Sequence, residues 1–185
     1  MTSGSVRRWL ALIVLSAGLL LAVSLWFRAQ YQGWFGASIP NVAVWGDNWQ
    51  HWVDRQPLDH PAMIHLMPAG CLCRFFTVQH ASALSEQARA LGYSRYQGGN
   101  IFLSSDLAVP LETSDFPASP GPLLALTDSD GSLRYLGPYS DGLRCTSANS
   151  LVDDWLPLSR PGQLLQVDAN SCQCDNFGLT TQAVP

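Results

Sequence analysis

The sequence predicts an α/β domain that follows one membrane-spanning helix. Residues 9–27 form an apolar run without a charged residue. A short apolar run at residues 63–67 is followed by apolar or small residues at helical spacing over residues 73–91. Two further apolar runs flank a turn at residues 128–131. Strand, helix, strand and hairpin in this order favour a mixed sheet of about four or five strands flanked by helices.

The apolar run at residues 9–27 is long enough to span a membrane. A helix rises about 1.5 Å per residue, so this run crosses a hydrocarbon core of about 30 Å. Arg7 and Arg8 precede it, which predicts that residues 1–8 stay in the cytoplasm. In a bacterial cell the chain is then a single-pass inner-membrane protein with a periplasmic C-terminal domain. The alternative is a cleaved signal peptide, but the small residues 22–24 lie inside the run, which favours an uncleaved anchor.

Residues 28–59 are expected to be a stem between the anchor and the domain. Residues 48–56 are expected to form a short amphipathic helix. The stem carries four tryptophans: Trp34, Trp45, Trp49 and Trp52. They either pack on the domain or lie at the membrane interface, and packing on the domain is the favoured interpretation. The domain is expected at residues 60–168, and a cysteine-containing tail at residues 169–185.

The first elements of the domain are a strand, a helix and a second strand. The strand at residues 63–67 is bounded by two prolines and has the apolar composition of a buried strand. The helix over residues 73–91 carries apolar side chains on one face and stops at Gly92, a helix breaker. The second strand is expected at residues 93–97 or at residues 101–104.

The second half of the domain is expected to be a hairpin with smaller elements around it. Residues 106–120 hold three prolines and are expected to be mostly loop. Residues 123–127 and 133–136 are expected to be the two strands of the hairpin. A helix is expected over residues 147–156, and a final strand at residues 163–167.

Cys71-Leu72-Cys73 stands at the junction between the first strand and its helix. Unpaired N–H groups and a partial positive charge at a helix N-terminus lower the pKa of a thiol and favour the thiolate. The chain has five cysteines, all beyond the anchor, and an exported domain can hold disulfides. Because the number is odd, at least one thiol is free, metal-bound or paired between chains.

Residues 61–156 resemble the thioredoxin-like superfamily, and the chain resembles more closely a family of uncharacterised single-pass bacterial envelope proteins with a Cys-x-Cys motif. Three local matches carry the resemblance. The dithiol stands between a strand and a helix. Pro122 begins an apolar segment that ends in Asp-x-x-Gly, as in exported reductases. His65 stands six residues before Cys71, where thioredoxins place a buried acid.

This resemblance implies a thioredoxin-like fold and a membrane-anchored, extracytoplasmic thiol–disulfide oxidoreductase that acts on protein cysteines. In that role Cys71 is the attacking thiolate and Cys73 resolves the mixed disulfide. Pro122 is expected to be cis and to face the dithiol, with Pro120 as the competing candidate. His65 is expected to relay protons, the alternative being a hydrogen-bonded core residue.

The motif departs from the usual Cys-x-x-Cys by one missing residue. A disulfide within Cys71-Leu72-Cys73 closes a smaller ring, which favours a strained and oxidising bond. Cys145 is either a further resolving thiol or the partner of Cys172 or Cys174. The pair Cys172-Gln173-Cys174 is alternatively a second dithiol that exchanges electrons with the first.

Two other functions fit the same cysteines. The first is a copper(I)-binding chaperone on the same fold, because soft thiolates select copper(I). Its ligands would be Cys71, Cys73 and His65. Two Cys-x-Cys pairs also fit a tetrathiolate zinc site, although Cys-x-x-Cys is the more usual spacing for zinc. The second function is a non-catalytic interaction module whose disulfides are fixed. Apart from the copper alternative, no cofactor is expected.

The amino-acid composition excludes some classes of binding partner and some kinds of catalytic chemistry. A net charge of -4 argues against a nucleic-acid partner. All ten basic residues are arginine, which excludes a Walker lysine and Schiff-base chemistry. The expected partners are protein thiols or disulfides, and the membrane through the N-terminal helix.

Overall fold

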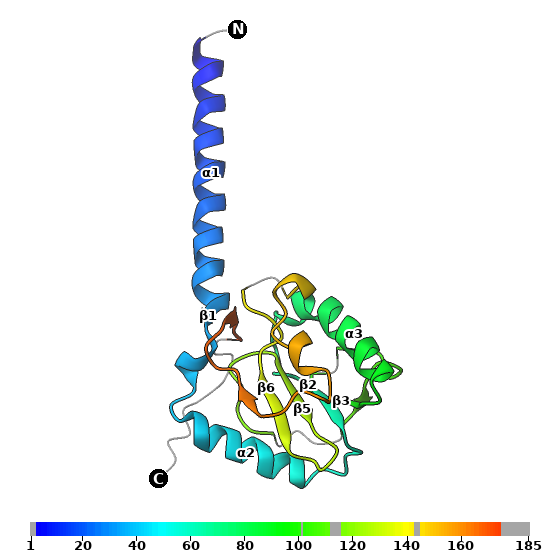
Figure 1. The fold of residues 1–185 in the computed structure, drawn as a ribbon. Coiled ribbons are helices and arrows are strands. Elements are labelled where there is room, and N and C mark those ends of the chain that lie inside the picture. Colours follow the sequence, from blue (N-terminus) through cyan, green and yellow to red (C-terminus); the bar gives the residue numbers. More distant parts are fainter. Residues whose placement is uncertain (1–2, 101, 112–115, 143–144, 175–185) are drawn as a thin grey trace.

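The computed structural model describes residues 3–100, 102–111, 116–142 and 145–174. Helix α1 (Ser3–Tyr31) projects from a domain that contains all the other elements (Figure 1). Its residues Val6–Arg28 are long and apolar enough to cross a membrane, and the large apolar side chains along them are exposed. The expected N-terminal helix is confirmed. Its retention, its orientation and the compartment of the domain stay predictions.

A six-stranded mixed sheet forms the centre of the domain. In spatial order its strands are β4 (Val109–Pro110), β3 (Ser94–Gly99), β2 (Ala62–Met67), β5 (Leu123–Thr127), β6 (Leu133–Gly137) and β7 (Leu164–Leu165). Strand β2 runs parallel to β3 and antiparallel to β5, which forms an antiparallel hairpin with β6. The expected order of strand, helix, strand and hairpin is confirmed, with the second strand near the first of its two expected positions.

Two helices contribute to the apolar layers on the two faces of this sheet. Helix α3 (Arg74–Ala90) packs on one face and α2 (Val42–Asp54) on the other. Met63 of β2 belongs to the layer that holds α3, and its neighbour Ile64 belongs to the layer that holds α2. Because both faces are covered, all six residues of β2 are buried and the strand reads as a continuous apolar run.

Helix α2 brings most of the stem into the domain core. It is longer than expected and starts at Val42, because the side chain of Asn41 caps it by accepting a hydrogen bond from the Val44 N–H at 3.2 Å. The buried tryptophans of the stem are Trp45, Trp49 and Trp52. Packing on the domain is therefore confirmed for these three, whereas Trp34 is 58% exposed.

The expected helix over residues 147–156 is wrong. This segment forms two short 3₁₀ turns, η2 (Ser147–Asn149) and η3 (Asp153–Trp155). The Ser150 hydroxyl oxygen lies 3.3 Å from the N–H groups of Val152 and Asp153 and accepts from both. Such local side-chain acceptors compete with the backbone bonds of an α-helix.

Buried Arg134 holds the segment after η3 against the sheet. Its guanidinium donates to the backbone carbonyls of Trp155, Pro157 and Arg160 and lies 2.9 Å from a carboxylate oxygen of Asp128. The carbonyl of Trp155 and two carbonyls beyond the segment are thus bound by a side chain. The chain then enters β7, a two-residue strand within the expected final strand.

A second, two-stranded sheet joins the stem to the tail. Strand β1 (Gln32–Trp34) directly follows α1 and pairs antiparallel with β8 (Asn170–Cys172). The register places Gln32 opposite Cys172. The short turn η1 (Phe35–Ser38) then leads towards α2. The tail therefore returns to the base of α1, where Figure 1 shows β1.

Candidate functional site

Cys71 and Cys73 lie where β2 ends and α3 begins, as expected. The turn between them and β2 contains Gly70 in the left-handed region, with φ of +71°. Cys73 is the residue before the first residue of α3, and its carbonyl accepts hydrogen bonds from the N–H groups of Phe76 and Thr77 at 3.0 Å. Both thiols therefore stand at the positive end of the helix.

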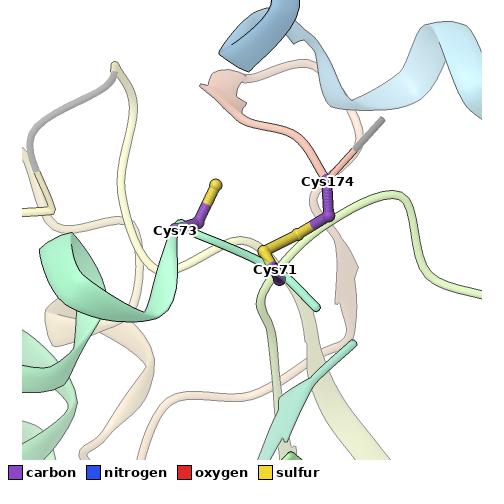
Figure 2. Close-up of side chains that lie close together, drawn as sticks. All are labelled: Cys71, Cys73 and Cys174. Carbon is purple, nitrogen blue, oxygen red and sulfur yellow. A yellow bond between two sulfur atoms is a disulfide. The ribbon is translucent and has the colours of Figure 1, made fainter. Parts of the chain in front are cut away.

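The two Cys-x-Cys motifs are joined to each other by two disulfides. Cys71 bonds to Cys174 with a Cα–Cα distance of 5.1 Å, and Cys73 bonds to Cys172 with 6.1 Å. Figure 2 shows the Cys71–Cys174 bond with Cys73 beside it. The small-ring disulfide between Cys71 and Cys73 is not formed in this structure. Each cysteine at the start of α3 instead has a partner in the tail, which is brought within reach by the pairing of β1 and β8.

The tail is also held by the segment that precedes β5. The backbone N–H of Cys174 donates to the carbonyl of Pro120 at 2.8 Å. A Cβ built on Gly121 would lie 2.6 Å from the carbonyl oxygen of Cys172, so only glycine allows this approach. The Gln173 side chain donates to the carbonyl of Trp34 in β1. These contacts position Cys172 and Cys174 independently of their sulfur bonds.

The expectation that Pro122 is cis is wrong. Among the described residues the cis peptide bond is His60–Pro61, and the bond before Pro122 is trans. The segment turns instead through Ser119, whose hydroxyl donates to the carbonyl of Gly121 at 2.6 Å. Pro120, the competing candidate, is the proline that meets the cysteine segment, through its carbonyl oxygen.

The four bonded cysteines are not equally buried. Cys71 and Cys172 are 3% exposed and Cys73 is fully buried, whereas Cys174 is half-buried. Met67 and Phe102 pack around them. In the disulfide-bonded state Cys71 is therefore not the exposed thiol that a turn position suggests. Of the four bonded residues, Cys174 is the least buried.

His65 is a hydrogen-bonded core residue of β2. Its Nδ1 lies 2.8 Å from the Tyr139 hydroxyl, and its Nε2 lies 2.8 Å from the Ser85 hydroxyl. Burial lowers the pKa of His65 to about 3, with smaller contributions from the charges of Arg95 and His80. Burial also raises the pKa of Tyr139, so its hydroxyl keeps its proton and can donate to His65.

The hydrogen bonds of His65 can be compared with its two expected roles, a proton relay and a core residue. A neutral imidazole with both nitrogens bonded matches the alternative of a satisfied core residue. The ring of Phe102 lies edge-on to His65 with centroids 6.3 Å apart, and Phe102 also packs on the cysteine cluster. The relay stays a prediction, and the two ring nitrogens of His65 bond to Tyr139 and Ser85.

Cys145 is a free thiol and is bonded neither to Cys172 nor to Cys174. Its Sγ lies 3.5 Å from the Thr77 hydroxyl, which donates to the carbonyl of Cys73 at 2.9 Å. Cys145 therefore stands beside the first turn of α3. Of its two expected roles, pairing with the tail does not occur, and that of a further resolving thiol stays a prediction.

A metal could be held by the cysteines once their disulfides are reduced. The sulfurs of Cys71, Cys73 and Cys174 lie within 4.8 Å of one another and form the single candidate metal group among the described residues. His65, expected as a copper ligand, is not part of it and already uses both ring nitrogens. A donor set made only of thiolates suits copper(I) or zinc.

The sequence did not predict the roles of two residues that complete the site, Gly121 and Gln173, and named Pro120 only as the competing proline. The one signal in the sequence was the repeated spacing. Two Cys-x-Cys motifs of equal length form two bonds when they run antiparallel, and the separations of 103 and 99 residues reflect that arrangement. The repeat alone did not distinguish this pairing from a zinc site or from a bond to Cys145.

Comparison with known families gives one match. Residues 47–176, more than half of the chain, match a family described as "Domain of unknown function (DUF6436)". The match covers the part of α2 from residue 47 onwards, the whole six-stranded sheet and all four bonded cysteines. Comparison with curated proteins found no match, and neither did comparison with solved structures.

Proposed function

The chain belongs to the family "Domain of unknown function (DUF6436)", and we propose that it is a membrane-anchored thiol–disulfide oxidoreductase that acts on protein cysteines outside the cytoplasm. One observation carries the proposal. Two Cys-x-Cys motifs meet at the N-terminus of α3, where each cysteine of one motif is bonded to a cysteine of the other. Such an arrangement allows disulfides to pass between neighbouring sulfurs.

The arrangement of the strands supports a thioredoxin-like fold, which we infer as part of the same proposal. The β2–α3–β3 unit has parallel strands, and the β5–β6 hairpin adds antiparallel strands next to β2. This is the order and direction of elements that the resemblance implies. The dithiol also stands at the end of β2 and the start of α3, where a redox dithiol of that superfamily is expected. Two features do not match: the bond before Pro122 is trans, and the helix expected after the hairpin is replaced by η2 and η3.

The exchange starts at Cys174, the least buried of the four bonded residues. A substrate thiolate attacks Sγ of Cys174, the bond from Cys174 to Cys71 breaks, and Cys71 leaves as a thiolate. The helix N-terminus stabilises that thiolate and makes it a better leaving group. A second substrate thiol then attacks the substrate sulfur of the mixed disulfide. The substrate gains a disulfide, and its two electrons and two protons end on Cys71 and Cys174.

The second disulfide allows the centre to pass the electrons on. The Cys71 thiolate attacks Sγ of Cys73, the bond from Cys73 to Cys172 breaks, and Cys172 leaves as a thiolate. The centre then holds a Cys71–Cys73 disulfide and a reduced Cys172-Gln173-Cys174 pair. The small-ring bond expected from the sequence is thus the state after one internal exchange. Every step is reversible, so the same centre reduces a substrate disulfide when electrons enter from the tail pair.

Thiol trapping with mass spectrometry tests the proposal. The full chain in detergent micelles is equilibrated in glutathione buffers of increasing reducing strength, quenched and mapped for each cysteine pair. Cys71–Cys174 is expected to open before Cys73–Cys172, and a Cys71–Cys73 bond is expected at intermediate potentials. Cys73→Ser is expected to abolish that third species, while Cys145→Ser leaves all three unchanged. Two disulfides that stay intact in the native state under strong reductant would instead indicate a stapled interaction module.

A copper(I) chaperone is the second candidate function, favoured by the convergence of three sulfurs within 4.8 Å. Its test is an anaerobic copper(I) titration of the fully reduced chain against a competing chelator. Binding much tighter than micromolar, lost in Cys174→Ser and kept in His65→Gln, is the expected result for this function. Micromolar or weaker binding that Cys174→Ser does not change would remove it.

A further inference from the structure

The start of α3 presents an apolar surface beside the cysteines. Leu72, Phe75 and Phe76 are 45%, 63% and 42% exposed, and we call these three residues the α3 face. Leu72 is the residue between the two cysteines, and the other two lie in the first turn of the helix. Large apolar side chains gathered this closely on a surface mark a site of contact with another apolar phase or molecule.

The α3 face touches the membrane-spanning helix itself. The ring of Phe76 packs edge-on against the ring of Phe27, with centroids 6.3 Å apart. Phe27 lies inside the segment Val6–Arg28 that is long and apolar enough to cross a membrane. A side chain in contact with Phe27 therefore lies at the depth where the hydrocarbon core ends, provided that the anchor is retained.

The short connection from α1 to β1 places the β1–β8 pair at the same depth in the membrane. Helix α1 continues only to Tyr31, and β1 starts at Gln32, four residues beyond Arg28. Four residues of helix rise about 6 Å. The headgroup layer on each side of the hydrocarbon core is about 5–7 Å thick. Cys172, which pairs with Gln32, is thus held at the level of the lipid headgroups.

Two arginines near the α3 face are consistent with a position at the level of the lipid headgroups. The Arg74 guanidinium lies over the ring of Phe75, 4.7 Å from its centroid, and Arg28 marks the end of the apolar segment. Aromatic rings at the edge of the hydrocarbon and arginines beside them, whose guanidinium groups reach the phosphates, are the usual composition of a protein surface that rests on a bilayer.

We propose that the α3 face lies in the interface of the bilayer that anchors the chain, so that the cysteine centre opens onto the membrane surface. The occupant of this face is lipid. If the centre exchanges disulfides, a step that rests on the function proposed above, its substrates are cysteines at the headgroup level of membrane proteins. Cysteines of proteins free in solution are then poor substrates.

Photo-cross-linking of the full chain tests this placement without reading any redox activity. A benzophenone amino acid replaces Phe75, or in the matched control replaces Val44, which is 52% exposed. Val44 lies on α2, at the end of the domain opposite α1 (Figure 1). Each variant is reconstituted in vesicles of phosphatidylcholine with a minor share of phosphatidylglycerol, irradiated and analysed by mass spectrometry. Intact disulfides in both variants establish that both are folded.

The expected result is a phospholipid adduct at position 75 with a yield several-fold above that at position 44. Equal yields at the two positions would overturn the proposal, and so would adducts at position 75 that join two copies of the chain in place of lipid. A chain purified from its native membrane without residues 3–31 would overturn it as well, because the anchor that sets the depth would be gone. The thiol-trapping result is independent of all these outcomes.

Discussion

The sheet core and the cysteine centre are held together in different ways. In the core, neighbouring residues of β2 and β5 alternate between two apolar layers. At the cysteine centre, two disulfides join residues that are 103 and 99 positions apart in the chain. The core is held by packing of many side chains and contains no bonded cysteine. The centre is held by two disulfides, a few backbone contacts and the β1–β8 pair. The difference implies that stability and sulfur exchange can be altered separately, by substitutions in one region at a time.

Removing all four bonded cysteines is expected to cause the largest loss of stability. In the chain-entropy description, one disulfide that closes a loop of about 100 residues contributes about 4–5 kcal/mol. The two bonds close nearly the same loop, so Cys174→Ala alone is expected to cost far less than the fourfold alanine variant. Urea unfolding of the full chain in micelles, followed by tryptophan fluorescence, measures both. A single substitution as costly as the fourfold one would show that the bonds do not share a loop.

Trp49→Ala is expected to disrupt the core and spare the centre. Trp49 is fully buried among Trp45, Trp52 and Phe116. Truncating a buried tryptophan costs about 3–5 kcal/mol. Trp34→Ala, at a 58% exposed position, should change the free energy of unfolding by about 0.5 kcal/mol or less. The order in which the disulfides open should be the same in both variants, and a reversed order in Trp49→Ala would contradict the separation.

Stability is expected to fall in acid partly because of His65. The folded-state pKa of His65 is lowered to about 3 from 6.5, so between these values the unfolded chain binds a proton that the folded chain does not. Stability therefore rises with pH through this window and is lost as the pH falls. At pH 5 the loss from this group amounts to about 2 kcal/mol.

Unfolding measured between pH 6.5 and 4 checks the His65 effect. His65→Gln should reduce the slope of stability against pH by about one proton, whatever its own cost at neutral pH. His51→Gln, at an exposed position, is the control and should leave the slope unchanged. An unaltered slope in His65→Gln would mean that the imidazole is protonated in the folded state, as a proton relay near neutral pH requires.

Much of the fold could be predicted from the sequence because its signals are local. The apolar run of β2, the helical spacing of α3 and the hairpin β5–β6 each lie within a few neighbouring residues, and their positions agree with the structure to within about two residues. The helix expected over residues 147–156 was wrong, and the chain that leaves this segment is held by distant Arg134, whose guanidinium binds the carbonyls of Trp155, Pro157 and Arg160. No local pattern contains that information.

The candidate site was predictable only in part for the same reason. The strand-to-helix position of Cys71 and Cys73 is local, and the structure places them there. Their partners depend on the return of the tail to β1 and on the close approach of Cys172 to Gly121. The bond before Pro122 is trans, the usual state of an X-Pro bond, and the cis expectation came from the resemblance alone.

The most direct test of the central claim is the time course of cysteine pairing after the oxidised full chain meets a limiting amount of a dithiol peptide. The account predicts that a mixed disulfide forms first on Cys174, followed by a Cys71–Cys73 bond as free Cys172 appears. Cys174→Ser is expected to remove the first step. A mixed disulfide that forms first on Cys71 or Cys73, or a Cys73–Cys172 bond that never exchanges while the peptide is oxidised, would contradict the relay between the two Cys-x-Cys motifs.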